Sequence, residues 1–455
     1  MNVAGSREPV QWRLRPGVLV AGAVVAVAVI ILLVNAISTP PQPVSHSGSG
    51  HAAQAPARTR ALSGASTTST QGGELAVKDT MPASGSQNVA TNTAITVTFS
   101  RPVRLGDVTP MLTPNTGGKW VQTNATTLTY ELRSPLIPSS QVEVTIPGGP
   151  SGIRGAQGAT LTRSQSVSFS VAAGDTLRLQ QLLAELNYLP VGFIPSGPPP
   201  TPADMAIDEA GSFTWRWSTL PTELTSQWTQ GTSNEITRAA VEDFENQNGL
   251  GVDGIAGPAV WSALINDALN KKVSGTPYVY VLVNKVQPEN LTLWSDGAPK
   301  DVGIPVNTGL SGADTTDGTY GVFEHVRYSE MKGTNPDGSH YDDPNVPYAS
   351  YFNGGDALHG FIRGSYGSPQ SNGCVEMSYA DAALVWPLTP IGTLVTVEGP
   401  NYGSAPPSTT TTTTTTTTAP PPPPPTTAAT TTTAPPPPAT TTTAPPVSPT
   451  TAAGG

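Results

Sequence analysis

The sequence predicts a multidomain, mostly β protein with a small three-helix domain, an N-terminal transmembrane helix and a disordered C-terminal tail. Residues 17–37 form a run of 21 residues without a charge. Two regions, 74–172 and 276–398, show the period-two alternation that is typical of strands, and leucines at helical spacing lie between them. Residues 404–455 are almost entirely Thr, Pro, Ala and Ser, which bury too little apolar surface to fold.

Composition sets limits on the whole chain. Of its 455 residues, 48 are Pro and 46 are Gly, and only 12% are charged. Much of this bias comes from the two ends, so the folded part is shorter than the chain. The net charge of −10 argues against nucleic acid as a partner, because phosphate binding needs clustered Lys and Arg.

The apolar run at 17–37 predicts a membrane anchor. As a helix it would extend about 31 Å, enough to cross a hydrocarbon core of about 30 Å. Arg7, Arg13 and Arg15 precede it. Because positive flanks stay in the cytoplasm, residues 1–16 are predicted to be cytoplasmic and the bulk of the chain extracytoplasmic, in a single-pass membrane protein.

A cleaved signal peptide is the alternative to the anchor. "VNA" at 34–36 resembles a small-residue cleavage site, and cleavage would make the protein secreted. The uncleaved anchor is favoured because the apolar run exceeds the usual signal core. Residues 38–73, rich in Ser, Thr, Gly, Ala and Pro, then form a flexible spacer.

Residues 74–172 are expected to form an antiparallel β-sandwich. Apolar residues occur at every second position in short runs, with Pro, Gly and Asn between them. The runs are "ITVTF" (95–99), "TLTYEL" (127–132), "VEVTI" (142–146) and "SVSFSV" (166–171).

Residues 174–268 are expected to be helical. The stretch 175–189 has leucines at i, i+3, i+4 and i+7, with Asp175 as its N-cap. A second helix is predicted within 234–250, and Pro258 begins a third. An insertion at 190–233 carries three tryptophans, for which core packing and stacking on sugar rings are the two alternatives: Trp215, Trp217 and Trp228.

Residues 276–398 return to strand patterning and hold the one cysteine of the chain, Cys374. The strand candidates are 278–283, 291–294 and 392–397. A single cysteine cannot form an internal disulfide, and exported proteins rarely keep a free thiol. Cys374 is therefore either a buried inert thiol or a nucleophile.

A nucleophilic thiol needs a base, and His359 is the best candidate. It lies 15 residues before Cys374 (374 − 359) and directly before Gly360, where backbone can approach closely. The glycine before the cysteine, Gly373, permits a tight turn that directs amide groups at an oxyanion.

Three segments resemble known domain families. "MPASGSQNVATNTAITVTFSRPV" (81–103) resembles the opening of bacterial Ig-like domains. "DGIAGPAVWSAL" (253–264) is similar to the end of the three-helix peptidoglycan-binding domain. "HG" followed about fifteen residues later by "S-x-G-C-V" resembles the L,D-transpeptidase (YkuD-type) catalytic domain. Together they indicate a bacterial, and more narrowly an actinobacterial, cell-wall enzyme.

The third resemblance implies roles for individual residues. It implies that Cys374 is the nucleophile and His359 the general base. Gly360 would orient the imidazole through its carbonyl, and the amides of Gly373 and Cys374 would form the oxyanion hole. No metal or organic cofactor is implied, and carbapenem β-lactams are expected inhibitors.

The sequence also departs from that family. Most members have His before the Gly–Cys pair, where this chain has Asn372, which can still donate a hydrogen bond to an oxyanion or a substrate. Glu376 stands where Arg or Asn is usual, and either meets a substrate amine or pairs with Arg363. Tyr348 and Tyr351 are expected beside the substrate, after a polar loop at 335–343.

The expected function is an L,D-transpeptidase that joins peptidoglycan stem peptides by 3→3 cross-links through a Cys thioester, with a tetrapeptide donor and an amine acceptor. An L,D-carboxypeptidase using the same acyl-enzyme is one alternative. A catalytically decayed wall-binding scaffold is another, and the absence of His at position 372 favours it.

Overall fold

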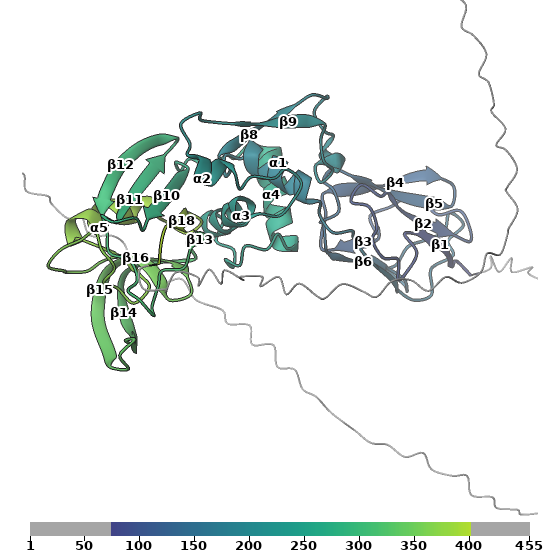
Figure 1. Ribbon diagram of the computed structural model, residues 1–455. Coiled ribbons are helices and arrows are strands. Elements are labelled where there is room, and N and C mark those ends of the chain that lie inside the picture. The colour runs from purple at the N-terminus through teal and green to yellow at the C-terminus, as the bar shows by residue number, and fades with distance from the viewer. Residues whose placement is uncertain (1–73, 402–455) are drawn as a thin grey trace, which may run out of the picture. The chain divides into compact units, whose positions relative to one another are not determined.

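The computed structural model describes residues 74–401. The predictions for 1–16, 17–37, 38–73 and 404–455, the membrane anchor among them, lie outside the described residues. No helix between residues 74 and 401 is both long and apolar enough to cross a membrane. This part of the chain is mostly β, with few helices (Figure 1).

The first domain is a sandwich of two antiparallel sheets, as predicted. One sheet has the order β1-β2-β5-β4 and the other β3-β6-β7. In the alternating runs, every second side chain points into the sandwich. Ile95, Val97 and Phe99 are buried between the sheets in this way. The strands are β1 (Val77–Met81), β2 (Ile95–Phe99), β3 (Met111–Thr113), β4 (Gly118–Asn124), β5 (Thr127–Leu132), β6 (Gln141–Ile146) and β7 (Gln165–Ser170).

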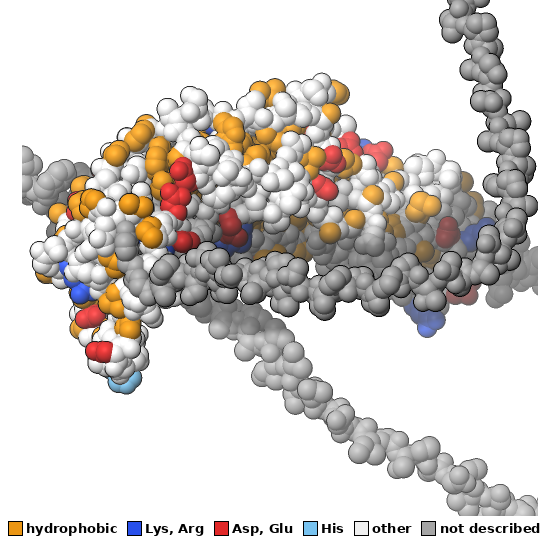
Figure 2. Space-filling view, viewed as in Figure 1, with side chains coloured by type: hydrophobic (Ala, Val, Ile, Leu, Met, Phe, Trp, Pro, Cys, Tyr) orange, Lys and Arg blue, Asp and Glu red, His pale blue; other side chains and the backbone are white. Residues whose placement is uncertain are grey.

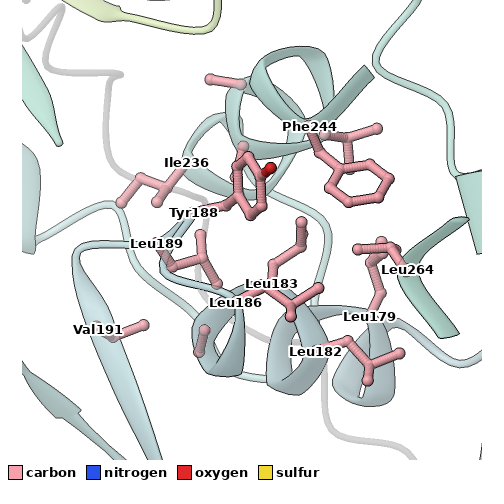
Figure 3. Packing of buried hydrophobic residues seen from close by; sticks show 14 of the residues in the cluster. Leu179, Leu182, Leu183, Leu186, Tyr188, Leu189, Val191, Ile236, Phe244 and Leu264 are labelled. Carbon is pink, nitrogen blue, oxygen red and sulfur yellow. The ribbon is translucent and has the colours of Figure 1, made fainter. Parts of the chain in front are cut away.

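The helical domain forms around the predicted leucine stripe. Asp175 accepts from the backbone N–H of Leu177 at 2.7 Å, which caps the first helix as expected. Leucines of this helix pack against Phe244 and Leu264 from the other two helices (Figure 3). The three helices are α1 (Thr176–Glu185), α3 (Glu235–Gln247) and α4 (Pro258–Asn270).

The insertion at 190–233 folds onto this helical core. It contains a hairpin of two strands. Its three tryptophans are partly buried against the core, so of the two predicted alternatives they show core packing. Trp228 lies edge-on to Phe213, with ring centroids 5.4 Å apart. The elements are β8 (Val191–Pro195), η1 (Pro202–Asp204), β9 (Gly211–Trp215) and α2 (Thr222–Thr225).

The third domain packs two sheets face to face over an apolar core. A five-stranded sheet has the order β12-β11-β10-β18-β13, and a four-stranded sheet has the order β14-β15-β16-β17. The predicted strands at 278–283, 291–294 and 392–397 are present as β10, β11 and β18. The elements are β10 (Val279–Asn284), β11 (Asn290–Ser295), β12 (Ala298–Pro305), β13 (Gly318–Gly321), β14 (Glu324–Thr334), β15 (His340–Asn353), β16 (Asp356–Gly360), β17 (Val375–Met377), α5 (Tyr379–Val385), η2 (Trp386–Leu388) and β18 (Leu394–Glu398).

The polar loop predicted at 335–343 is shorter than expected. Its last residues, from His340 on, belong to β15, which pairs with β14 in a long antiparallel hairpin (Figure 1). Pro344 and Pro347 concealed this strand, because proline inside a run argues against a strand assignment. On the face visible in Figure 2, hydrophobic side chains of the described residues are scattered between polar ones.

Candidate active site

His359 lies on β16, which pairs in parallel with β17, and Cys374 lies in the turn that leads directly into β17. In the pairing of β16 with β17, His359 lies opposite Glu376. Cys374 precedes Glu376 by two residues in the turn before β17, and the amide of Ala357, two residues before His359 on β16, bonds its sulfur.

The imidazole of His359 is held by its own strand. Its side chain is 2% exposed, and Nδ1 lies 3.1 Å from the Gly360 carbonyl oxygen. A carbonyl only accepts, so Nδ1 carries the proton and Nε2 is left as the basic nitrogen. Burial lowers the pKa of His359, although the Gly360 carbonyl and the Glu376 carboxylate raise it in part. The ring is therefore neutral at pH 7 and able to accept a proton.

Gly360 is required here by packing as well as by its carbonyl. A Cβ at this position would lie 2.9 Å from Cδ1 of Tyr379 and 3.1 Å from Cβ of Ala382, both in α5. The absence of a side chain lets α5 pack against β16 directly beside His359. The close approach predicted at Gly360 is thus present, and the element that approaches its backbone is the helix α5.

The thiol of Cys374 is half-buried and protonated. Its Sγ donates to the Gly355 carbonyl at 3.6 Å. Burial raises the pKa of the thiol to about 12; the Ala357 amide lowers it, and the charges of Asp356 and Glu376 raise it further. Cys374 and His359 therefore start as a neutral pair, and the thiol must lose its proton during the attack itself.

This protonation state predicts an unusual pH dependence of thiol alkylation. Below its pKa, the thiolate fraction rises about tenfold per pH unit. Alkylation of Cys374 by iodoacetamide should therefore keep rising up to about pH 10, whereas an ordinary thiol with a pKa of about 8.5 levels off. Rates measured across this range by intact mass check the prediction, and a plateau near pH 8 would contradict it.

The turn before Cys374 differs from the prediction in one amide. The Gly373 N–H, expected to point at an oxyanion, donates instead to Ser371 Oγ at 3.2 Å. The Ser371 hydroxyl in turn donates to the Cys374 carbonyl at 2.5 Å. The reason is local: a serine hydroxyl readily captures an amide two residues on. Of the two predicted donors, this leaves the Cys374 amide.

Asn372 reaches from this turn to the hairpin loop. Its Nδ2 donates to Oδ1 of Asn335 at 2.6 Å, while its Oδ1 is buried without a hydrogen-bond partner. One of the two N–H groups of the Asn372 side chain is thus used by the loop between β14 and β15. The side chain links the catalytic turn to the hairpin, a contact that the sequence did not predict.

Asn372→Ala tests what this side chain does. If its second N–H assists an oxyanion, the acylation rate of Cys374 should fall by about 10²–10³, the usual loss for one such donor. Asn335→Ala is the matched control, because it removes the link to the hairpin loop and leaves the Asn372 amide in place. The rates are measured by quenching the acylation at set times and weighing the intact protein. Equal losses in the two variants would mean that Asn372 acts only through its hydrogen bond to Asn335.

Glu376, predicted as a substrate contact or an ion-pair partner, forms the ion pair. Both of its oxygens accept from Arg363, from Nε and Nη2, at 2.7 Å each. The residue is 4% exposed, and a carboxylate at that depth needs such a partner. Its charge is compensated within the chain, which favours the ion-pair role over a contact with an incoming amine.

The two predicted tyrosines have different surroundings. Tyr351 bonds Ser329 through its hydroxyl at 2.7 Å. Burial raises the pKa of Tyr351, which lies opposite Ala357 in the pairing of β15 with β16. Tyr348 packs on Trp386, with ring centroids 5.9 Å apart. Tyr341, which the sequence did not single out, lies opposite Gly333 in the hairpin of β14 and β15, and burial raises its pKa.

The two other histidines of this domain make separate contacts. His325 stacks on Trp386 at 4.2 Å between ring centroids, and its Nδ1 lies 3.0 Å from Ser350 Oγ. His340 is exposed at the start of β15, with Nδ1 3.1 Å from Thr334 Oγ1. Neither shares the strand pair that holds Cys374.

Asp356 is a neighbour of the site that sequence reasoning missed. A Cβ on Gly373 would contact its carboxylate, and burial raises the pKa of Asp356 to about 6. It follows a turn, where aspartate is common, so no pattern set it apart. In residues 74–401, no group of three or more His, Cys, Asp or Glu side chains is arranged to hold a metal ion.

Family models match each of the three domains. The L,D-transpeptidase catalytic domain matches residues 278–397, the putative peptidoglycan binding domain matches 224–264, and the bacterial Ig-like domain matches 72–171. A comparison with curated proteins gave no match.

Solved structures of L,D-transpeptidases are similar at low identity. The L,D-transpeptidase from Mycobacterium smegmatis is 13% identical, with 72% of this chain and 100% of that chain covered and a TM-score of 0.25. L,D-transpeptidase 3 from Mycobacterium tuberculosis is 15% identical, with 71% and 99% covered and a TM-score of 0.25. The catalytic domain from the E. faecium L,D-transpeptidase is 22% identical, with 28% and 100% covered and a TM-score of 0.24.

The domain assignment rests on the family models, each of which overlaps one of the predicted units; the peptidoglycan-binding model matches only the later part of the helical unit. The chain therefore carries, in order, a bacterial Ig-like domain, a putative peptidoglycan-binding domain and a domain of the L,D-transpeptidase (YkuD) catalytic family.

Proposed function

We propose that the protein is a cell-wall L,D-transpeptidase that forms 3→3 cross-links through a thioester on Cys374. The observation that supports this proposal is the pairing of β16 with β17, which holds a neutral, oriented imidazole on the strand next to the one that Cys374 leads into. A membership of residues 278–397 in the catalytic family supports the same reaction class.

In the first half-reaction, the Cys374 thiol attacks the carbonyl carbon of the third residue in a tetrapeptide stem. His359 Nε2 takes the thiol proton as the S–C bond forms. The tetrahedral oxyanion then collapses, the bond to the terminal D-alanine breaks, and His359 returns the proton to the departing amine. The product is a thioester and free D-alanine.

In the second half-reaction, the side-chain amine of another stem attacks the thioester. His359 accepts a proton from the amine, and the thiolate leaves and regains a proton. The Glu376 carboxylate and the Gly360 carbonyl both raise the pKa of His359, so they favour the imidazolium that exists between these transfers. A positioned amine has a large effective concentration and should outrun water.

Hydrolysis of the same thioester would make the protein an L,D-carboxypeptidase, which is the nearest alternative. A catalytically decayed scaffold is the other alternative. The free thiol of Cys374 and the neutral, oriented imidazole of His359 favour a live enzyme over a scaffold.

The remaining parts of the chain suggest where this reaction takes place. We place the enzyme at the outer face of the cytoplasmic membrane, anchored by residues 17–37, with the domain matched at 224–264 directing it to peptidoglycan. Stem peptides are then both donor and acceptor. Carbapenems, which present a strained carbonyl to the same thiol, are the expected inhibitors.

The full chain, given disaccharide-tetrapeptides, should release D-alanine and form dimers linked between two third-position residues. Product masses and fragmentation identify the linkage. Tripeptides and D-alanine without dimers, even at high stem concentration, would replace transpeptidation with the carboxypeptidase reaction. Binding of stem peptides with no product at all would favour the scaffold.

A further inference from the structure

A buried threonine from a separate loop holds the carbonyl of the residue before Cys374. Thr315 Oγ1 donates to Gly373 O at 2.7 Å and accepts from Gly309 N at 2.8 Å. The side chain of Thr315 has no exposed surface. A buried hydroxyl that both donates and accepts is fixed in rotation, so it fixes the carbonyl that it contacts.

The backbone of Thr315 is held as well. Lys285 Nζ donates to Thr315 O at 3.0 Å and pairs with Asp317 at 2.6 Å. Lys285 is 2% exposed, and a buried ammonium with these partners keeps one position. Thr315 therefore keeps one position, and its hydrogen bond to the Gly373 carbonyl restrains the turn that carries Cys374.

The Gly373–Cys374 peptide transmits this position to the amide of Cys374. The peptide is trans, so its C=O and N–H point in opposite directions within one plane. Holding Gly373 O therefore sets the direction of the Cys374 N–H. Gly373 has φ +113°, a region that favours glycine, so no side chain of its own restrains the peptide and the contact from Thr315 sets its orientation.

We propose that Thr315 is a positioning residue for acyl transfer: through the Gly373 carbonyl, it aims the Cys374 amide at the oxyanion. The inference rests on the proposed function, because only a carbonyl addition creates an oxyanion. The Gly373 amide is taken by Ser371 Oγ, so the Cys374 amide carries this task. The chemistry of the thiol itself does not depend on Thr315.

The test compares two reactions of Cys374 in the full chain. Acylation by the carbapenem imipenem passes through an oxyanion, whereas alkylation by iodoacetamide does not. Thr315→Val removes the hydroxyl and keeps the shape. We expect acylation to slow by about 10–100-fold, less than the loss for a deleted donor because the amide remains. Alkylation should change by less than about twofold, since the thiol and its pKa are untouched.

Two further variants complete the experiment. Thr315→Ser keeps the hydroxyl and should restore acylation to near the wild-type rate. Thr316→Val changes the adjacent, exposed threonine and should leave both reactions unchanged.

Three results for the Thr315 variants would overturn the inference. One is acylation of Thr315→Val at the wild-type rate. The second is an equal loss of acylation and alkylation, which would mean that the whole turn is disordered. The third is failure of Thr315→Ser to recover acylation. A wild-type chain that alkylates but never acylates would overturn the proposed function, and this inference with it.

Discussion

Replacing Cys374 with alanine should abolish both D-alanine release and dimer formation. Cys374 is the one cysteine of the chain, so the variant has no thiol to form a thioester. The acyl group then has no covalent carrier on the enzyme, so neither transfer to an amine nor hydrolysis can proceed through a thioester. High-resolution separation of the products, with the wild-type chain run in parallel, measures both losses.

Cys374→Ser is the matched control for this loss. It keeps a small polar group at the end of the turn but replaces the thiol by a hydroxyl with a far higher pKa. We expect a large loss of activity with an unchanged melting temperature. Dimer formation by Cys374→Ala at more than a trace of the wild-type rate would show that the acyl group is carried elsewhere.

His359→Ala should slow acylation of Cys374 by about 10²–10⁴, the usual contribution of a general acid–base. The effect is large because burial raises the pKa of the thiol to about 12, so little thiolate forms without a base. Acylation by imipenem, followed by intact mass at neutral pH, measures the loss. Raising the pH should restore part of the rate in the variant, as hydroxide replaces the missing base.

His340→Ala is the control, because that histidine is exposed and bonds only Thr334 among its described contacts. It should acylate at the wild-type rate. His325 is less suited to this purpose, since its stack on Trp386 makes its removal costly to stability. An effect of His340→Ala equal to that of His359→Ala would require another base.

Strands with strict alternation were predicted well from the sequence. Ile95–Phe99 and Thr127–Leu132 were predicted with both ends correct, because one face of each strand is buried and the other is not. The start of α1 after Asp175 was also predicted correctly, since a capping side chain is a local signal. β15 was missed, because its two prolines and paired aspartates hide the period.

The pairing of Cys374 with His359 was also within reach of the sequence. One thiol and a histidine beside glycine leave few candidates, and the structure has His359 on β16 and Cys374 in the turn that leads into the adjacent β17. The roles of Thr315 and Ser371 were not predictable. Thr315 bonds the Gly373 carbonyl from a loop that is distant in the sequence. Ser371 bonds the Cys374 carbonyl within its own turn. Such contacts leave no spacing or periodicity in the sequence.

The fate of Glu376 shows why substrate contacts are hard to predict. From the sequence alone, the Glu376 carboxylate, two residues after the nucleophile, could bind either an incoming amine or an arginine. Only the fold decides, by placing Arg363 where its guanidinium meets both oxygens. Tyr351 lies opposite Ala357 because β15 runs beside β16, and the sequence did not reveal the hairpin that contains β15.

The acyl-enzyme itself provides the most direct measurement. The full chain is mixed with disaccharide-tetrapeptide, quenched in acid and digested, and the fragment that contains Cys374 is weighed. We expect it to carry the mass of the disaccharide-tripeptide acyl group, and to lose that mass to a stem amine with formation of a 3→3 dimer. Dimers formed while Cys374 stays unmodified, or an acyl group that leaves only to water, would contradict a Cys374 transpeptidase.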